Sequence, residues 1–414
     1  MNLSIRYRLT VLVPLICLLL LGAGGGPGAP LQLHAEEFRF RYSAGTKFKA
    51  LSEVDEEVYY NGRFAYNALI LNRIAWEVKD ASRGSGLIEG TFITTEQLGI
   101  DRPVYEISST YSSRYWRQAD GTYDIEPDYY MPVVRNVPVF PEGDIEVGGS
   151  WKAPGEEVHD LRRDYGIDVP LRIPFRASYR YLGQGEFKGK EYDLISVQYT
   201  VRHQTSSYFA RYPLYPVRIS GFSDQLIYWD GENGYPHAYT EQFSFIYSLS
   251  NGDEYEFTGT ATTEITETVP MDRARIAEEV QRRIKEEGVE DTEVSADERG
   301  VTLNLENIQF APDSADLLPG EEDKLERIAE ILERYPDRDL LITGHTALAG
   351  TPEGRQRLST DRAAAIARYL LDRGIRDRKE ILIEGKGASE PIADNSTPEG
   401  MRKNRRVEIT LLEN

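Results

Sequence analysis

The sequence predicts a multi-domain protein in which a β-rich N-terminal part precedes a smaller α/β part. The chain has 414 residues, which is more than one ordinary hydrophobic core accommodates. Along the first two-thirds, apolar and polar residues alternate with a period of two, and turn dipeptides separate the alternating segments. In the last third, one-sided helical stripes alternate with short apolar runs, as in strands covered by helices.

The composition excludes several classes of function. Lys and Arg total 48 against 68 Asp and Glu, so the net charge of −20 repels nucleic acid, which we exclude as a partner. The chain has one cysteine, Cys17, and its five histidines include no pair at the spacing of metal ligands. We therefore expect no metal site and no cofactor.

The first 35 residues have the pattern of an export signal. Arg6 and Arg8 precede an apolar run, Val11 to Leu21, that is too short to span a membrane, and Leu33-His34-Ala35 suits cleavage. Cys17 lies inside the apolar run, and we expect it to be removed with residues 1–35. The sequence thus predicts an exported protein.

Residues 36–268 predict a β-rich domain built as an antiparallel sheet, a sandwich or a half-barrel. Phe38 to Tyr42 alternates with a period of two, and so do three later segments: Ile195–Val201, Phe243–Tyr247 and Tyr255–Glu267. Turns are indicated at Asn61-Gly62, Asp120-Gly121, Asp230-Gly231, Asn233-Gly234 and Asn251-Gly252.

Three roles for this domain stay open. Thr46–Glu57 and Trp76–Arg83 place charges on both faces of the predicted strands, which favours a periplasmic domain over an outer-membrane β-barrel. The barrel remains an alternative, and so does a β cup that carries a lipid or another ligand. The sequence does not identify that ligand.

Residues 269–300 predict a helix and a hairpin that link the two parts. Asp272 suits the N-cap of a helix that ends at Gly288. Its apolar stripe is Ile276, Val280 and Ile284. The hairpin would pair Val289–Ser295 with Val301–Leu305.

Residues 301–414 predict the order strand, helix, strand, helix, strand, short helix, strand. Two of the helices begin with the same four letters, at Thr351-Pro352-Glu353-Gly354 and Thr397-Pro398-Glu399-Gly400. Threonine caps the helix, proline suits its first position, and glutamate suits the positive end of the helix dipole.

Three separated motifs in this region resemble one known family. They are Gly344-His345-Thr346-Ala347, Leu358-Ser359-Thr360-Asp361-Arg362-Ala363 and Asn404-Arg405-Arg406-Val407. In this order and spacing they resemble the OmpA-like C-terminal domain, over roughly residues 270–414. The resemblance implies an α/β domain that associates with peptidoglycan, in a periplasmic protein associated with the outer membrane.

The resemblance also implies a binding site for the stem peptide of the cell wall. In the family an acid and an arginine clasp the amino and carboxylate groups of the peptide's diamino acid, which needs an anion and a fork-shaped cation in one cleft. Arg362 matches the clasping arginine, and Arg405 matches a second arginine that lines the cleft. The residues expected at the site are Arg362, Arg405, Thr346, Ala347, Arg355 and Ala311.

Three of these positions depart from the family pattern. Ala347 replaces the clasping aspartate, Ala311 falls where the family has another acid, and Arg355 falls where it has asparagine. The cleft therefore becomes more positive by about three charge units. Loss of one charge-assisted hydrogen bond weakens binding by about one to two decades. We therefore expect altered or weakened binding, including a preference for a diamino acid other than diaminopimelate, such as ornithine.

No catalytic arrangement emerges from the sequence. It has no Gly-x-Ser-x-Gly motif and no cysteine nucleophile beyond residue 35. We predict a non-enzymatic envelope protein whose partners are the peptidoglycan stem peptide and outer-membrane or periplasmic proteins. The alternatives are an envelope scaffold that has lost peptidoglycan binding and an outer-membrane β-barrel with a periplasmic OmpA-like domain.

Overall fold

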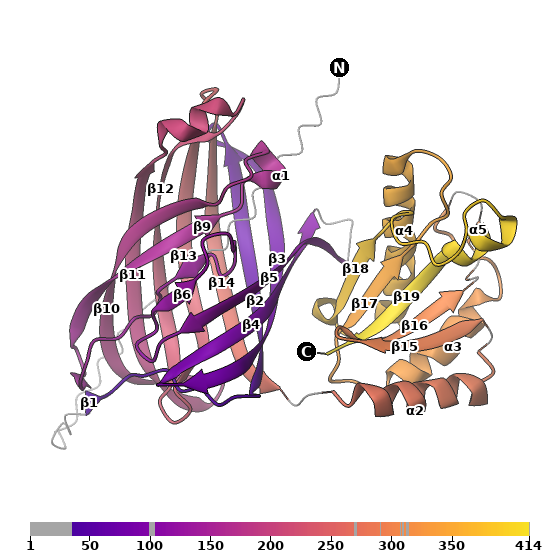
Figure 1. Ribbon diagram of the computed structural model, residues 1–414, viewed down its shortest axis with the longest axis horizontal. Helices are drawn as coiled ribbons and strands as arrows, with labels where there is room; N and C mark the ends of the chain where they lie inside the picture. The colour runs from indigo at the N-terminus through magenta and orange to yellow at the C-terminus, as the bar shows by residue number, and fades with distance from the viewer. Residues whose placement is uncertain are drawn as a thin grey trace, which may run out of the picture. The chain divides into compact units, whose positions relative to one another are not determined.

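The computed structural model describes residues 35–98, 104–268, 271–289, 291–306, 308, 310–311 and 314–413. The predicted signal peptide, residues 1–35, lies outside this description except for its last residue. The described chain forms two compact units (Figure 1). The first unit contains residues up to 94 and 110–268, and the second contains 95–109 and the residues from 269 onward.

Long strands make up most of the first unit. They are β2 (Lys47–Tyr60), β3 (Arg63–Ser82), β4 (Ser85–Leu98), β5 (Tyr105–Arg117), β9 (Ser150–His159), β10 (Leu171–Phe187), β11 (Lys190–Gln204), β12 (Pro216–Asp230), β13 (Tyr235–Leu249) and β14 (Glu254–Thr268). The short elements are β1 (Ala35–Glu36), β6 (Tyr123–Ile125), β7 (Val134–Arg135), β8 (Ile145–Glu146), α1 (Arg162–Tyr165) and η1 (Ser207–Arg211).

The strands form a curved antiparallel sheet, which Figure 1 shows in violet to pink. Its neighbours run in the order β9, β10, β11, β12, β13, β14, β2, β3. Asn61 and Gly62 turn β2 into β3 with φ of 49° and 74°, the positive values that a tight hairpin needs. The predicted antiparallel β-rich domain is confirmed.

Strand β10 shows how alternation builds the core of this unit. Its inward residues, among them Ile173, Phe175 and Tyr179, are buried in one hydrophobic cluster. Its outward residues alternate with them and include Arg172, Arg176 and Arg180, which are exposed. Charged side chains on the outward face are hydrated, whereas a strand that faces lipid carries apolar residues there.

The strand predicted at Phe38–Tyr42 is wrong. Phe38 and Phe40 are buried at 0% and 4% exposure, so the alternation is real. The backbone, however, makes single bonds to two different segments, from Phe40 N to Ala119 O and from Arg41 N to Gly234 O. This stretch is therefore extended and inserted into the core without joining a ladder.

The second unit is a mixed sheet packed against helices. Its elements are α2 (Arg273–Glu286), β15 (Thr292–Asp297), β16 (Gly300–Glu306), α3 (Glu321–Leu332), β17 (Leu340–Gly344), α4 (Pro352–Asp372), η2 (Arg378–Glu380), β18 (Ile381–Gly385), α5 (Pro398–Asn404) and β19 (Arg406–Leu412). The strand order is β15, β16, β19, β17, β18. Tyr105 and Glu106, which belong to this unit, pair in parallel with β18. The predicted order of strands and helices is confirmed.

Helix α2 begins as its sequence predicts. The Asp272 side chain accepts a hydrogen bond from Arg275 N at 3.1 Å, which caps the helix. The three apolar residues of its stripe are buried in the same cluster as the residues of β16 and β19: Ile276, Val280 and Ile284. This segment therefore shares the core of the second unit. In the described part of the chain, no helix combines the length and apolar character of a membrane span.

Candidate functional site

Helix α4 positions the candidate site because it approaches the ends of β17 and β18 closely. A Cβ on Gly344 would lie 2.0 Å from Ser359 O, and a Cβ on Gly385 would lie 2.3 Å from Thr360 Oγ1. Only glycine fits at either strand end. The loops that follow these strands thus emerge beside the N-terminal half of α4.

The start of α4 is fixed by its own residues. The Thr351 side chain accepts a hydrogen bond from Gly354 N at 3.1 Å, and Pro352 occupies the first turn. Thr397 accepts from Gly400 N at 3.0 Å at the start of α5. Both predicted caps are confirmed.

The loop after β17 is anchored by a buried ionic cluster. His345, 1% exposed, donates its backbone N–H to Arg406 O, and its Nε2 lies 3.5 Å from Glu408 Oε1. Arg406 Nη2 lies 2.7 Å from the same carboxylate oxygen. Burial alone would raise the pKa of Glu408, but His345 and Arg406 outweigh it and lower the pKa to about 2. This cluster ties the loop to β19.

Thr346 and Ala347 follow in this loop and are buried at 6% and 4% exposure. Thr346 N donates to Gly387 O at 2.8 Å, which joins the loop to the one after β18. Among the described residues, Thr346 Oγ1 has no hydrogen-bond partner. Ala347 presents only a methyl group where the family pattern has a carboxylate. The next residue, Leu348, is 60% exposed.

Arg362 lies on α4 and points into the protein, with 8% exposure. Its Nε donates to Ser314 O at 3.1 Å, and its guanidinium carbon lies 4.9 Å from the centre of the Phe310 ring. Ala311 is in the same segment, half-buried, and its backbone N donates to Asp316 O. The structure thus brings Arg362 and the segment of Ala311 into contact.

Arg355 and Arg405 lie near the loop that contains Thr346. Arg355 is half-buried and donates from Nη1 to Gly350 O at 2.6 Å, and its Cβ would lie 3.5 Å from a Cβ on Gly387. Arg405 is exposed and directly precedes Arg406, whose carbonyl accepts from His345 N. Arg355 and Arg362 are seven residues apart, about two turns and roughly 10 Å along one face of α4. Helix α4 therefore connects the Ala311 segment, which Arg362 contacts, with the loop of Thr346, near which Arg355 lies.

The sequence interpretation missed the role of Arg406. It lies in a run of basic residues that suggests a solvated face, yet Arg406 is 3% exposed and paired with Glu408. The alternation of β19, which places residues 406 and 408 on one face, is the signal that indicates this pairing. Within the ranges described above, no group of three or more His, Cys, Asp or Glu residues is arranged to hold a metal ion.

The strand order, the α4 packing and the anchored loop define a mixed α/β domain with the candidate site at the ends of β17 and β18. The family model described as "OmpA family" matches residues 309–405. The C-terminal part of this chain is an OmpA-family domain, as the sequence predicts.

Curated relatives resemble the same part of the chain. The probable lipoprotein YiaD of Escherichia coli is 39% identical over 112 residues, 27% of this chain and 51% of the relative. The peptidoglycan-binding protein ArfA of Mycobacterium tuberculosis is 41% identical over 104 residues, 25% of this chain and 32% of the relative. The chain thus spans about half the length of the first relative and about a third of the second.

A solved structure also resembles this region. The cell wall anchor of the T6SS from Pseudomonas aeruginosa is 30% identical, with a TM-score of 0.30. The similarity covers 34% of this chain and all of that one.

Proposed function

We propose that this chain is a non-enzymatic envelope protein whose OmpA-family domain associates with peptidoglycan. The observation that carries the proposal is the family match over residues 309–405, with Arg362 and Arg405 retained at the positions of the family's arginines. The name of the ArfA relative describes a peptidoglycan-binding protein, which supports the same activity here. We further propose export by residues 1–35 and a periplasmic location at the outer membrane.

We also propose that the domain binds diaminopimelate stem peptides weakly. Ala347 and Ala311 supply no carboxylate for the amino group of the diamino acid, whereas Arg355 adds a cation that makes its own bond to the loop. Arg405 is exposed and suited to bind a carboxylate of the peptide. A wall peptide with fewer or less accessible amino groups fits this charge pattern better.

The test is co-sedimentation of the full chain with purified sacculi. We expect Arg405→Ala to reduce retention by roughly tenfold, because a hydrogen bond to a charged group is worth about 1.5–3 kcal/mol. Arg402→Ala is the matched control, since it removes the same charge three residues earlier in the same basic run. Equal retention of wild type and Arg405→Ala would remove Arg405 from the site.

A second candidate is an envelope scaffold that has kept the fold and lost the ligand. The observation that favours it is the burial of Arg362, whose guanidinium contacts Ser314 O and the Phe310 ring. On this reading Arg362 stabilises the segment before α3. Retention of the wild-type chain no greater than that of an unrelated acidic protein would favour the scaffold.

A further inference from the structure

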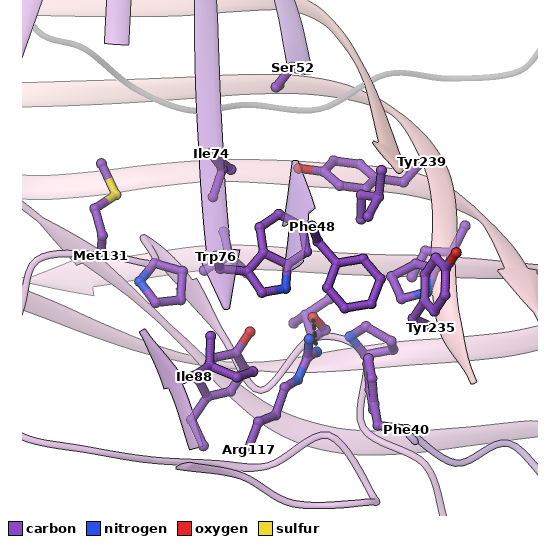
Figure 2. A pocket seen from close by; sticks show the side chains of 18 of the residues that line it. Phe40, Phe48, Ser52, Ile74, Trp76, Ile88, Arg117, Met131, Tyr235 and Tyr239 are labelled. Carbon is purple, nitrogen blue, oxygen red and sulfur yellow. Dashed lines mark hydrogen bonds between the residues drawn. The ribbon is translucent and has the colours of Figure 1, made fainter. Parts of the chain in front are cut away.

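The first unit contains a cavity of about 230 Å³ that is partly open to the surface. Its lining is mainly aromatic and aliphatic and includes Phe48, Ile74, Trp76, Ile88, Met131 and Tyr239. Figure 2 shows Trp76 and Phe48 between Ser52 at one end and Arg117 at the other. The Phe48 and Trp76 rings stack at 5.5 Å. Residues from several strands thus form an apolar chamber.

The volume restricts what fits in this chamber. An engineered apolar cavity of about 150 Å³ holds benzene, whereas sites for drug-sized ligands start at about 300 Å³. A slim apolar chain therefore suits the cavity better than a two-chain lipid does.

Arg117 gives the cavity a cationic end. The side chain is half-buried, and its guanidinium carbon lies 3.7 Å from the centre of the Phe40 ring and 4.7 Å from that of Tyr123. Its hydrogen bonds to Gly121 O and Val137 O are long, at 3.4 and 3.3 Å. Within the described ranges it forms no ion pair with a carboxylate. The nearby Asp120 carboxylate instead accepts from Thr122 N and Oγ1.

A second donor lies at the same end. The Tyr42 ring stacks with Phe40, the ring that Arg117 covers, at 6.3 Å and 9°. Tyr42 lines the cavity, and its buried hydroxyl has no hydrogen-bond partner among the described residues. Burial raises the pKa of Tyr42, so the hydroxyl keeps its proton and can donate. A buried donor without a partner costs free energy that a ligand acceptor would offset.

The cavity also contains a buried acid, Glu241, on β13. Ser223 Oγ donates to its Oε1 at 2.7 Å, and Gln225 Nε2 donates to the same oxygen. Burial raises the pKa of Glu241 well above its ordinary value, which favours the neutral carboxyl over the carboxylate. This shift reduces the repulsion between Glu241 and an anionic ligand.

We propose that the first unit binds a single-chain amphiphile with an anionic head, with its hydrocarbon chain packed against Phe48, Trp76 and Ile74 and its head at Arg117 and Tyr42. The head is a carboxylate or a phosphate, since both accept from a guanidinium and a phenol. This ligand is separate from the wall peptide proposed for the OmpA-family domain.

The test is titration of the full chain with cis-parinaric acid, a slim fluorescent fatty acid. Trp76 lines the cavity, so bound probe should accept excitation energy from tryptophan. Dodecanoate, dodecyl phosphate and dodecanol then compete for the site. Both anions should displace the probe better than the neutral alcohol, and the better of the two identifies the head group.

Substitutions at two positions, Arg117 and Ala261, test whether the ligand binds in this cavity. Arg117→Met should weaken binding of dodecanoate by about tenfold and leave dodecanol binding unchanged. Arg176→Met is the matched control, because Arg176 is exposed on the outward face of β10. Ala261→Phe, or the smaller Ala261→Leu, should fill the cavity and abolish probe binding, with thermal melting as the check on folding. The proposal is overturned if wild type binds no probe, if Arg117→Met binds dodecanoate as tightly as wild type, or if a folded Ala261 variant retains the probe.

Discussion

At the scale of single residues, Glu408 combines burial with two cationic neighbours. Its carboxylate contacts Arg406 at 2.7 Å and His345 at 3.5 Å, and its pKa falls from 4.5 to about 2. A carboxyl whose pKa is lower in the folded state stabilises the fold above its unfolded pKa. That contribution is lost as the pH falls from about 4.5 to about 2. The stability of the loop that contains Thr346 and Ala347 should therefore fall as the pH drops through the acid range.

We predict that Glu408→Gln destabilises the second unit by about 1–2 kcal/mol at pH 7, after allowance for solvent screening. The difference from wild type should shrink as the pH falls towards 2, because Glu408 of the unfolded chain is protonated below about pH 4.5 and that of the folded chain takes up its proton near pH 2. Hydrogen-exchange protection of β17 and β19 peptides measures this. Tryptophan fluorescence does not report on the second unit, because all four tryptophans lie in the first: Trp76, Trp116, Trp151 and Trp229.

The control for this prediction is Glu330→Gln, which removes an exposed acid on α3. It should change protection by less than about 0.5 kcal/mol at either pH. A Glu408→Gln difference that is the same at pH 7 and at pH 2.5 would contradict the ionic role assigned to the cluster.

At the scale of elements, helix α4 determines most of the geometry of the candidate site, because it carries both Arg355 and Arg362. Thr351 caps the helix through Gly354 N, and the helix packs directly on the backbone at Gly344. A frayed first turn would release Arg355 from Gly350 O. The geometry of the candidate site thus depends on how α4 begins.

We predict that Thr351→Ala destabilises the first turn of α4 by about 1 kcal/mol, since it removes the side-chain acceptor of the cap. Thr351→Ser should retain most of the cap, because it keeps the hydroxyl. Hydrogen exchange of peptides from residues 351–358 provides the measurement. Equal protection in the alanine and serine variants would show that the cap does not hold this turn.

Local chemistry made part of this structure predictable. The caps at Thr351 and Thr397 and the stripe of α2 depend on residues within one or two turns, so the sequence contains all of their information. The burial of Arg406 was not predictable in this way, because it depends on where β19 lies between β16 and β17. The structure of Phe38–Tyr42 was not predictable from local sequence either. Its alternation is that of a strand, but its backbone hydrogen bonds go to residues that are distant in sequence.

The candidate site was predictable only in part. The family motifs indicate Arg362, Arg405 and the loop at Thr346, whereas the contact of Arg362 with Ser314 requires the folded chain. The sequence left a ligand-carrying β cup open as an alternative, but it did not indicate which residues line the cavity of the first unit. Phe48, Trp76, Arg117 and Tyr239 come from four strands, and only the sheet registers place them around one space.

At the scale of the whole molecule, the chain combines an OmpA-family domain with a β domain that contains an apolar cavity. We propose that the OmpA-family domain binds the cell wall and that the β domain binds an amphiphile. The domain boundaries proposed from the sequence, at 268 and 300, are best tested by limited proteolysis of the full chain. Cleavage near 268 should release a protease-resistant C-terminal fragment.

The most direct test of the central claim is titration calorimetry of the full chain with a diaminopimelate stem peptide. Ala347→Asp restores the family's carboxylate, and Ala349→Asp adds the same charge at an exposed position two residues away. We predict that Ala347→Asp binds the peptide about ten- to a hundredfold more tightly than wild type, and that Ala349→Asp does not. Equal affinity of Ala347→Asp and wild type, with the fold intact, would contradict a binding site at this loop.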